Sequence, residues 1–243
     1  MEYLNFATLD AIDTARYRAA RPFPWVSLEG ALTDAGYREL LATPPPFELF
    51  EKDFGYQRKH GQESHDRYAL NWTPEREPEL PAPWVALIHE CLSPRYREFL
   101  CRLYDAPACT LRFHWHYTPR GRSVSPHCDS PEKLGSHIFY LNTEADWDPS
   151  WGGETVILDD GGRIPRRSAP AFSDFAHAIR ANSLGNRSLI FTSARHGWHG
   201  VEPVRCPEDR MRKVFIAVIN KAKQRTRFLR RLYRTVAGRP VRA

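Results

Sequence analysis

The sequence predicts a mostly β protein with flanking helices (α+β), built around a double-stranded β-helix, or jelly roll. Two observations predict this fold class. Before about residue 109 the apolar residues recur at helical spacing, whereas from residue 110 the period changes to two. Several short strand candidates then follow, separated by glycine-containing breaks. Many short strands after a helical segment are typical of a jelly-roll barrel with helices packed outside it.

The N-terminal part, about residues 1–108, is predicted to be helical support with irregular connections. Thr33 stands before a short helical stretch that three consecutive prolines stop. A second apolar helix is expected over 84–92. Ser93 then has the character of an N-cap, and Pro94 occupies the first helical position of the following helix.

The C-terminal part, about residues 109–220, is predicted to be the jelly-roll core, and residues 1–220 together form a single domain. Aromatic and aliphatic residues from Leu111 to Tyr117 alternate with Arg112, His114 and His116, as expected for a half-buried strand. Further strands are expected at 137–142, 154–158, 188–192 and 213–219.

Composition favours one globular domain in a reducing compartment. A chain of 243 residues can bury one substantial core. Its five cysteines are an odd number at irregular spacing, which fits free thiols better than a disulfide framework. The first residues show no secretory signal, and no apolar stretch approaches the length of a membrane span. We therefore expect a cytoplasmic protein.

The net charge of +6 belongs to the C-terminal tail, residues 221–243. The tail holds nine Lys/Arg and no Asp/Glu, and without it 26 basic residues face 29 acidic ones. Nucleic acid is therefore not an expected partner of the domain. Apolar residues within 225–237 fall at helical spacing, which predicts a basic amphipathic helix. Such a helix can lie on an anionic membrane surface, or it can pack on the domain or on a dimer partner. The sequence leaves the oligomeric state open.

The most informative motif is His127-Cys128-Asp129, followed seventy residues later by His199. Two imidazole nitrogens and one carboxylate oxygen are the set that holds a mononuclear non-haem Fe(II) on one face. Residues two apart on a strand point the same way, so we expect a strand that turns His127 and Asp129 toward a metal and Cys128 away from it.

Several ordered motifs surround these residues. They are Ser125-Pro126-His127-Cys128-Asp129, Phe139-Tyr140-Leu141-Asn142, Trp151-Gly152-Gly153-Glu154-Thr155, Asn186-Arg187-Ser188-Leu189-Ile190-Phe191, His199-Gly200-Val201-Glu202-Pro203-Val204 and Arg212. In this order, over about residues 110–220, the chain resembles the Fe(II)/2-oxoglutarate-dependent dioxygenase superfamily, specifically its prolyl-4-hydroxylase-like branch.

The resemblance implies a role for each matched residue. His127, Asp129 and His199 would bind Fe(II), with 2-oxoglutarate as co-substrate, O₂ as oxidant and ascorbate as activator. A basic residue ten or more positions after the distal histidine would bind the far carboxylate of 2-oxoglutarate. We favour Arg212, because a strand beginning there turns it into the barrel; Arg210 is the alternative.

The implied activity is hydroxylation of an unactivated C–H bond, with release of succinate and CO₂. The substrate is a small molecule or a peptide: a prolyl or other residue in a peptide, a free amino acid, a natural-product intermediate, and a cell-envelope sugar or lipid precursor all fit. Val124 stands where prolyl hydroxylases commonly carry a tyrosine, so a prolyl substrate is not required. The alternative is a non-catalytic jelly-roll binding or scaffold protein that retains the metal site.

Three related metal sites fit the sequence less well. A cupin site needs a glutamate soon after the His-Trp-His stretch 114–116, and the first one is Glu132. Alkylation-repair dioxygenases carry a second arginine six residues after the first, but Val218 stands six residues after Arg212. Carrier-protein halogenases replace the carboxylate ligand with a small residue, whereas this chain has Asp129.

Two features beside the motifs have alternative explanations. His196 competes with His199 as distal ligand; it lacks the Val-x-Pro-Val pattern that follows His199, so we expect it outside the ligand set. The long connection 159–187 is either a flap over the metal that contacts substrate or a solvated excursion with a short helix.

Overall fold

The computed structural model describes residues 1–222. Apart from its first two positions, the basic tail 221–243 therefore lies outside the described residues. The stretch 225–237, expected to contact a membrane or a packing partner, lies outside them entirely. Within 1–222, no helix is both long enough and apolar enough to cross a membrane.

The described chain is built from short elements. The α-helices are α1 (Phe6–Asp10), α2 (Thr14–Ala19), α3 (Asp34–Ala42), α4 (Ala82–Leu92) and α5 (Pro94–Tyr104). The strands are β1 (Trp25–Glu29), β2 (Glu51–Asp53), β3 (Arg67–Asn71), β4 (Cys109–Pro119), β5 (Val124–His127), β6 (Lys133–Tyr140), β7 (Val156–Asp159), β8 (His177–Arg180), β9 (Arg187–Thr192), β10 (His199–Val201) and β11 (Met211–Lys221). Short 3₁₀ helices lie at Phe47–Leu49, Lys59–Gly61, Pro74–Glu79, Pro149–Trp151 and Phe172–Asp174.

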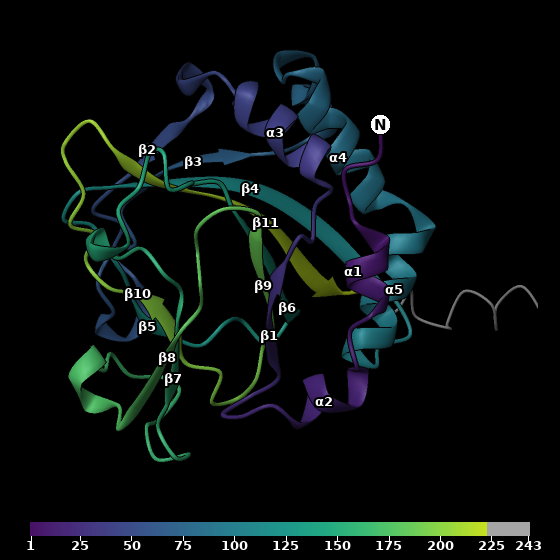
Figure 1. Cartoon of the computed structure of the whole chain (residues 1–243). Helices are drawn as coiled ribbons and strands as arrows, with labels where there is room; N and C mark the ends of the chain where they lie inside the picture. Colours follow the sequence, from purple (N-terminus) through teal and green to yellow (C-terminus); the bar gives the residue numbers. More distant parts are fainter. Residues whose placement is uncertain (223–243) are drawn as a thin grey trace, which may run out of the picture.

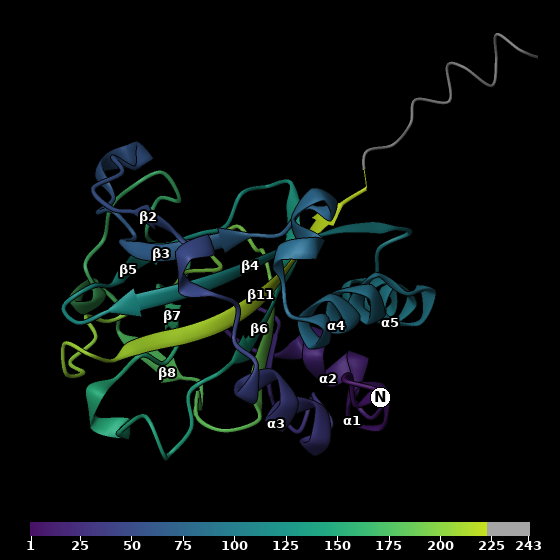
Figure 2. The same ribbon diagram turned by 90° about the horizontal axis from the view of Figure 1, so that it is seen from above.

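The strands form two antiparallel sheets, which Figure 1 shows from the side. The larger sheet has the strand order β1-β9-β6-β11-β4-β3-β2, and the smaller one has the order β5-β10-β7-β8. Helices lie outside the larger sheet, and the smaller sheet covers its other face (Figure 2). This arrangement confirms the predicted α+β fold class with a jelly-roll core.

The main hydrophobic core lies between the larger sheet and helices α4 and α5. Trp84 of α4 packs edge-on against Trp115 of β4 and Phe215 of β11, with ring centroids 5.3 and 5.4 Å apart. All three side chains are fully buried. Each such residue contributes about 1.5–3 kcal/mol by leaving water, so this layer fixes the sheet on which the site is built.

The other face of β4 and β11 is turned toward the smaller sheet. The two strands pair along eleven residues, with Arg212 opposite Thr118 and Ile216 opposite His114. Because side chains alternate along a strand, burying Trp115 and Phe215 under the helices directs His114 and Arg212 to the barrel interior. The site therefore lies on the face away from the helices.

Two predicted helix starts are confirmed in detail. The Thr33 side chain caps α3 by accepting a hydrogen bond from the Gly36 backbone N–H at 3.1 Å. Ser93 caps α5 by accepting one from the Tyr96 N–H at 3.4 Å, and Pro94 occupies the first turn. The predicted helix over 84–92 is α4, which begins two residues earlier.

The prediction of helical support with irregular connections before residue 109 is wrong for three segments, which are strands. β1 pairs with β9 at one end of the larger sheet, and β3 with its partner β2 extends the other end next to β4. These strands are only three to five residues long. Strand formation depends on partners distant in sequence, so such short segments give little local signal.

Candidate metal centre

The three predicted metal-ligating residues come together on the smaller sheet. His199, the first residue of β10, lies directly opposite His127, the last residue of β5, and their ring centroids are 4.4 Å apart. With Asp129 they offer one ligand atom each, all within 4.8 Å of one another. Two histidines and a carboxylate at this spacing could hold one transition-metal ion.

The expected strand geometry of the His-x-Asp motif is wrong in one respect. Only His127 belongs to β5, and Asp129 lies beyond the strand end. The pairing of β5 with β10 ends at the His127–His199 pair, so Asp129 is not held by the sheet ladder. The turn after β5, rather than strand alternation, brings the Asp129 carboxylate to the histidines.

Both imidazoles are oriented by backbone carbonyl groups. Nδ1 of His127 donates to the Ser125 carbonyl at 2.9 Å, and Nδ1 of His199 donates to the Gly197 carbonyl at 2.9 Å. Each hydrogen bond places the proton on Nδ1 and leaves the Nε2 lone pair available for a metal. Burial lowers the pKa of both rings, which favours the neutral, metal-binding form.

The Asp129 carboxylate is buried and paired through one oxygen only. Oδ1 accepts a hydrogen bond from Nζ of Lys133 at 2.6 Å, whereas Oδ2 is buried without a hydrogen-bond partner. Burial alone would raise the pKa of Asp129, but the nearby Lys133 charge and the His199 ring outweigh it, so the pKa is lowered. A buried, ionised oxygen without a donor is what a cation ligand requires.

Lys133→Met is expected to destabilise the metal-free protein by on the order of 2 kcal/mol, because Asp129 would keep a buried charge without its partner. Saturating Mn(II) should reduce that loss, since the bound cation compensates the same carboxylate. Thermal unfolding with and without Mn(II) measures both quantities. The exposed Lys59→Met is the matched control. An equal loss with and without Mn(II) would contradict metal binding at Asp129.

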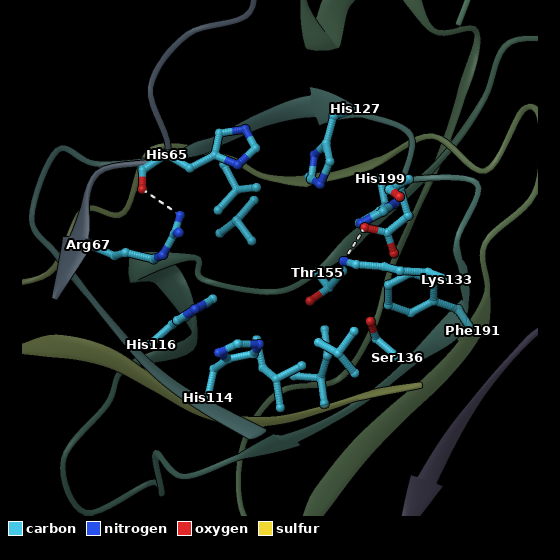
Figure 3. A pocket seen from close by; sticks show the side chains of 18 of the residues that line it. His65, Arg67, His114, His116, His127, Lys133, Ser136, Thr155, Phe191 and His199 are labelled. Atoms are coloured by element: carbon cyan, nitrogen blue, oxygen red, sulfur yellow. Dashed lines mark hydrogen bonds and ion pairs between the residues drawn. The ribbon is translucent and has the colours of Figure 1, made fainter. Parts of the chain in front are cut away.

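The three residues line one end of a cavity of about 400 Å³ between the two sheets. In Figure 3, His127 and His199 lie on one side, and Arg67, His114 and His116 lie opposite. The lining also includes Arg212, so the expected Arg212 position inside the barrel agrees with the structure. A cavity of this volume is ordinary for small-molecule sites.

Arg212 is the buried cation of this cavity. Its Nε donates to the Gly153 carbonyl, and one terminal nitrogen lies 3.3 Å from Thr155 Oγ1. Its guanidinium also stands 5.7 Å from the centroid of the Tyr140 ring. Within residues 1–222 it forms no ion pair, which leaves it open to an anionic ligand. The alternative, Arg210, is exposed, lies outside this cavity and pairs with Asp209 at 3.4 Å.

The second glycine of the Trp-Gly-Gly-Glu motif, Gly153, lies against Arg212. Its φ is +94°, and a Cβ added there would stand 3.3 Å from Cδ of Arg212 and 3.2 Å from the Trp147 ring. A side chain would therefore push against Arg212 in addition to straining the backbone. The motif keeps room for the arginine.

We expect Gly153→Ala to weaken binding of an anionic ligand at Arg212 by about three- to tenfold, which corresponds to roughly 1 kcal/mol. The matched control is Gly162→Ala, because Gly162 has a φ of +75° and open space around its Cβ position. Both variants incur about 1–2 kcal/mol of backbone strain. Calorimetric titration separates the two effects; equal ligand affinity in both variants would show that Arg212 tolerates the added methyl.

The structure also shows where His196, the two histidines of β4 and segment 159–187 lie. His196 bonds Asp160 Oδ2 at 3.0 Å and is not part of the three-residue cluster. His114 and His116 line the cavity. Segment 159–187 contains β8, which pairs with β7 at the edge of the smaller sheet. Among the described residues no side chain of this segment lines the cavity, although Arg166 bonds the Asp129 carbonyl.

Four ionisable residues of the cavity were not singled out from the sequence: Arg58, His65, Arg67 and Lys133. His65 is buried 4.7 Å from His127, measured between ring centroids, and its Nε2 lies 3.0 Å from Ser125 Oγ. Sixty-two residues separate the two histidines, so no local spacing could reveal the contact. For Arg67 a weak signal existed, since the strand pattern of 67–71 places it on the same face as Ala69.

Comparisons with known proteins bear on the site as a whole. Residues 113–218 match the family model of the 2OG-Fe(II) oxygenase superfamily. None of the curated proteins matches this sequence. The matched range includes all three clustered residues and Arg212.

Solved structures share the fold at low identity. A Pseudomonas putida prolyl-4-hydroxylase is 14% identical, with a TM-score of 0.56, covering 86% of this chain and 98% of its own. A Trichoplax adhaerens prolyl hydroxylase in complex with a hypoxia inducible factor peptide is 14% identical, with a TM-score of 0.54 and coverages of 88% and 87%. The non-heme alpha ketoglutarate dependent carbocyclase SnoK from nogalamycin biosynthesis is 13% identical, with a TM-score of 0.59 and coverages of 97% and 96%. The resemblance of this chain to the Fe(II)/2-oxoglutarate-dependent dioxygenases, on their prolyl-4-hydroxylase-like branch, is thereby confirmed.

Proposed function

We propose that this protein is an Fe(II)- and 2-oxoglutarate-dependent dioxygenase that hydroxylates an unactivated C–H bond. The observation that carries the proposal is the convergence of His127, Asp129 and His199 with the buried Arg212 in one cavity. A metal site next to an arginine without an acidic partner is the arrangement that a chelating dicarboxylate co-substrate needs.

The residues present fit an Fe(II) ion. Two Nε2 atoms and the unpaired Asp129 Oδ2 supply a neutral and anionic N/O donor set, and Lys133 holds the second carboxylate oxygen. When bound, iron with O₂ and 2-oxoglutarate supplies the oxidising chemistry and releases succinate and CO₂. The protein's part is to hold the three donors in place and to surround them with the side chains of the cavity.

Arg212 is proposed to bind the far carboxylate of 2-oxoglutarate. A guanidinium can donate two parallel hydrogen bonds to a carboxylate, and the Gly153 carbonyl and Thr155 hydroxyl hold this one in position. Its burial keeps water from competing for the ligand. The co-substrate would thereby be oriented along the inner face of β11 toward the histidines.

The substrate is proposed to be a small molecule or a peptide. The Trichoplax structure was solved with a peptide, and SnoK is a carbocyclase from nogalamycin biosynthesis. We propose that residues 1–220 form the catalytic domain and that ascorbate keeps the iron reduced. The five cysteines are free thiols, which supports a cytoplasmic, reducing location.

Succinate release from 2-oxoglutarate tests the proposal. The purified full-length protein would be supplied with Fe(II), ascorbate and O₂ and then screened against peptides, amino acids, natural-product intermediates and envelope precursors. We expect iron-dependent succinate release that one class stimulates. Binding of Mn(II) and 2-oxoglutarate without any succinate release under Fe(II) would instead identify a non-catalytic binding protein.

A further inference from the structure

The cavity carries more positive charge than the proposed co-substrate can use. Its lining side chains include one acid, Asp129, and five permanent cations: Arg58, Arg67, Arg112, Lys133 and Arg212. Lys133 is paired with Asp129, and Arg212 would be paired with 2-oxoglutarate. Arg67 is paired with Asp53, which does not line the cavity, so Arg58 and Arg112 remain without an acidic partner among residues 1–222.

Histidine does not add to this charge. Burial and the neighbouring charges of Arg58 and Arg67 lower the pKa of His65 to about 3. Burial and the charge of Arg112 lower the pKa of His114 to about 4.

Arg58 and Arg67 both line the cavity, and Arg67 donates a hydrogen bond to the His65 carbonyl. Both are half-buried, and each one's charge acts on His65. Burial and the charge of Arg67 both lower the pKa of Arg58, so the two guanidinium groups repel each other. Repelling charges taken partly out of water are unfavourable unless an anion joins them.

The hydrogen bonding of this arginine pair is incomplete. Arg67 bonds Asp53 at 2.7 Å and the His65 carbonyl at 2.9 Å, but its Nε is buried without a partner. Arg58 makes one long contact, 3.5 Å to Gln62 Oε1, and within residues 1–222 it forms no ion pair. Both guanidinium-bearing side chains line the cavity, and in Figure 3 Arg67 lies on the side opposite Lys133.

We propose that Arg58 and Arg67 bind a negatively charged group of the primary substrate, a carboxylate or a phosphate ester. Arg112, exposed at the cavity mouth on β4, draws the same group in. This proposal rests on the proposed function in one respect: Arg212 is excluded from binding the primary substrate only if it binds 2-oxoglutarate. It narrows the substrate to an anionic molecule whose reacting C–H bond lies between the arginine pair and the metal centre.

Matched small ligands test this arginine pair. Butyrate, propyl phosphate and the neutral butyramide would be titrated calorimetrically into full-length protein saturated with Mn(II) and 2-oxoglutarate, so that Arg212 is occupied. We expect one anion to bind at least about tenfold more tightly than butyramide, since charge-assisted hydrogen bonds contribute that much. The tighter anion distinguishes a phosphate ester from a carboxylate.

Variants assign the binding to the pair. Arg58→Gln should weaken anion binding about tenfold, with butyramide and 2-oxoglutarate binding unchanged; Arg67→Lys is a second variant that keeps a partner for Asp53. The exposed Arg210→Gln should bind like wild type. Equal affinity for all three ligands, or an equal loss in Arg210→Gln, would overturn the proposal.

The same titration distinguishes the two proposals. If wild-type protein binds Mn(II) and 2-oxoglutarate but no anion, the arginine pair fails and the proposed function stands. If Mn(II) and 2-oxoglutarate do not bind, the proposed function fails. Repeating the anion titration without them, in wild type and Arg58→Gln, then still decides whether the pair binds anions.

Discussion

Replacing His127, Asp129 or His199 with alanine is expected to lower Fe(II)-dependent succinate formation by at least about 100-fold. Each substitution removes one of three protein donors, so the metal binds more weakly and the reacting groups are misplaced. The fold should persist, because the main core lies on the other face of the larger sheet. Succinate release and Mn(II) affinity, measured on the same samples, check both parts.

The matched control for this experiment is His196→Ala. His196 is half-exposed three residues before His199 and bonds Asp160 instead of joining the cluster. We expect its turnover within about threefold of wild type, because His196 lies outside both the cavity and the three-residue cluster. Near-wild-type activity in His199→Ala together with a severe loss in His196→Ala would exchange the roles of the two histidines.

Arg212→Ala is expected to raise the apparent requirement for 2-oxoglutarate on the order of 100-fold. Truncating one partner of a buried, hydrogen-bonded charge pair costs about 2–5 kcal/mol, much of it because the other charge is left unpaired. Metal affinity should change little, because Arg212 is not one of the three clustered donors. A titration of 2-oxoglutarate at saturating Fe(II) measures the effect.

Arg210→Ala provides the comparison, since the two arginines are two residues apart. The exposed Arg210 pairs only with Asp209, and such surface pairs contribute about 0–1 kcal/mol. Its requirement for 2-oxoglutarate should stay within about fivefold of wild type. A larger defect in Arg210→Ala than in Arg212→Ala would assign the carboxylate to the turn before β11.

Much of the fold could be predicted because its signals are local. Thr33 and Ser93 each cap a helix by accepting a hydrogen bond from the backbone N–H three positions later. The alternation in β4 follows from the burial of one face of the strand. The same alternation, applied to β11, gave the expected inward direction of Arg212. β1 to β3 could not be predicted in this way, because their pairing with distant strands decides their conformation.

The site residues that belong to sequence motifs could be predicted, whereas those brought to the cavity only by the packing of distant segments could not. His127 and His199 stand in ordered motifs, so their meeting across β5 and β10 was expected. By contrast, Arg58 and His65 come from the connection between β2 and β3, which the sequence analysis did not relate to the core. Their position follows from how that connection packs over β5, which is a property of the whole barrel.

The eleven-residue pairing of β4 with β11 also limits how this chain can change in length. A shift of this ladder by one residue would turn Arg212 toward the helices and bring Phe215 into the cavity. An insertion or deletion inside either strand would therefore move core side chains into the cavity and cavity side chains into the core. The turn between β10 and β11, residues 202–210, has no such constraint, because most of its residues are exposed. Divergence in this protein should therefore proceed by substitution within the two strands and by length change in the turns that join them to the rest of the barrel.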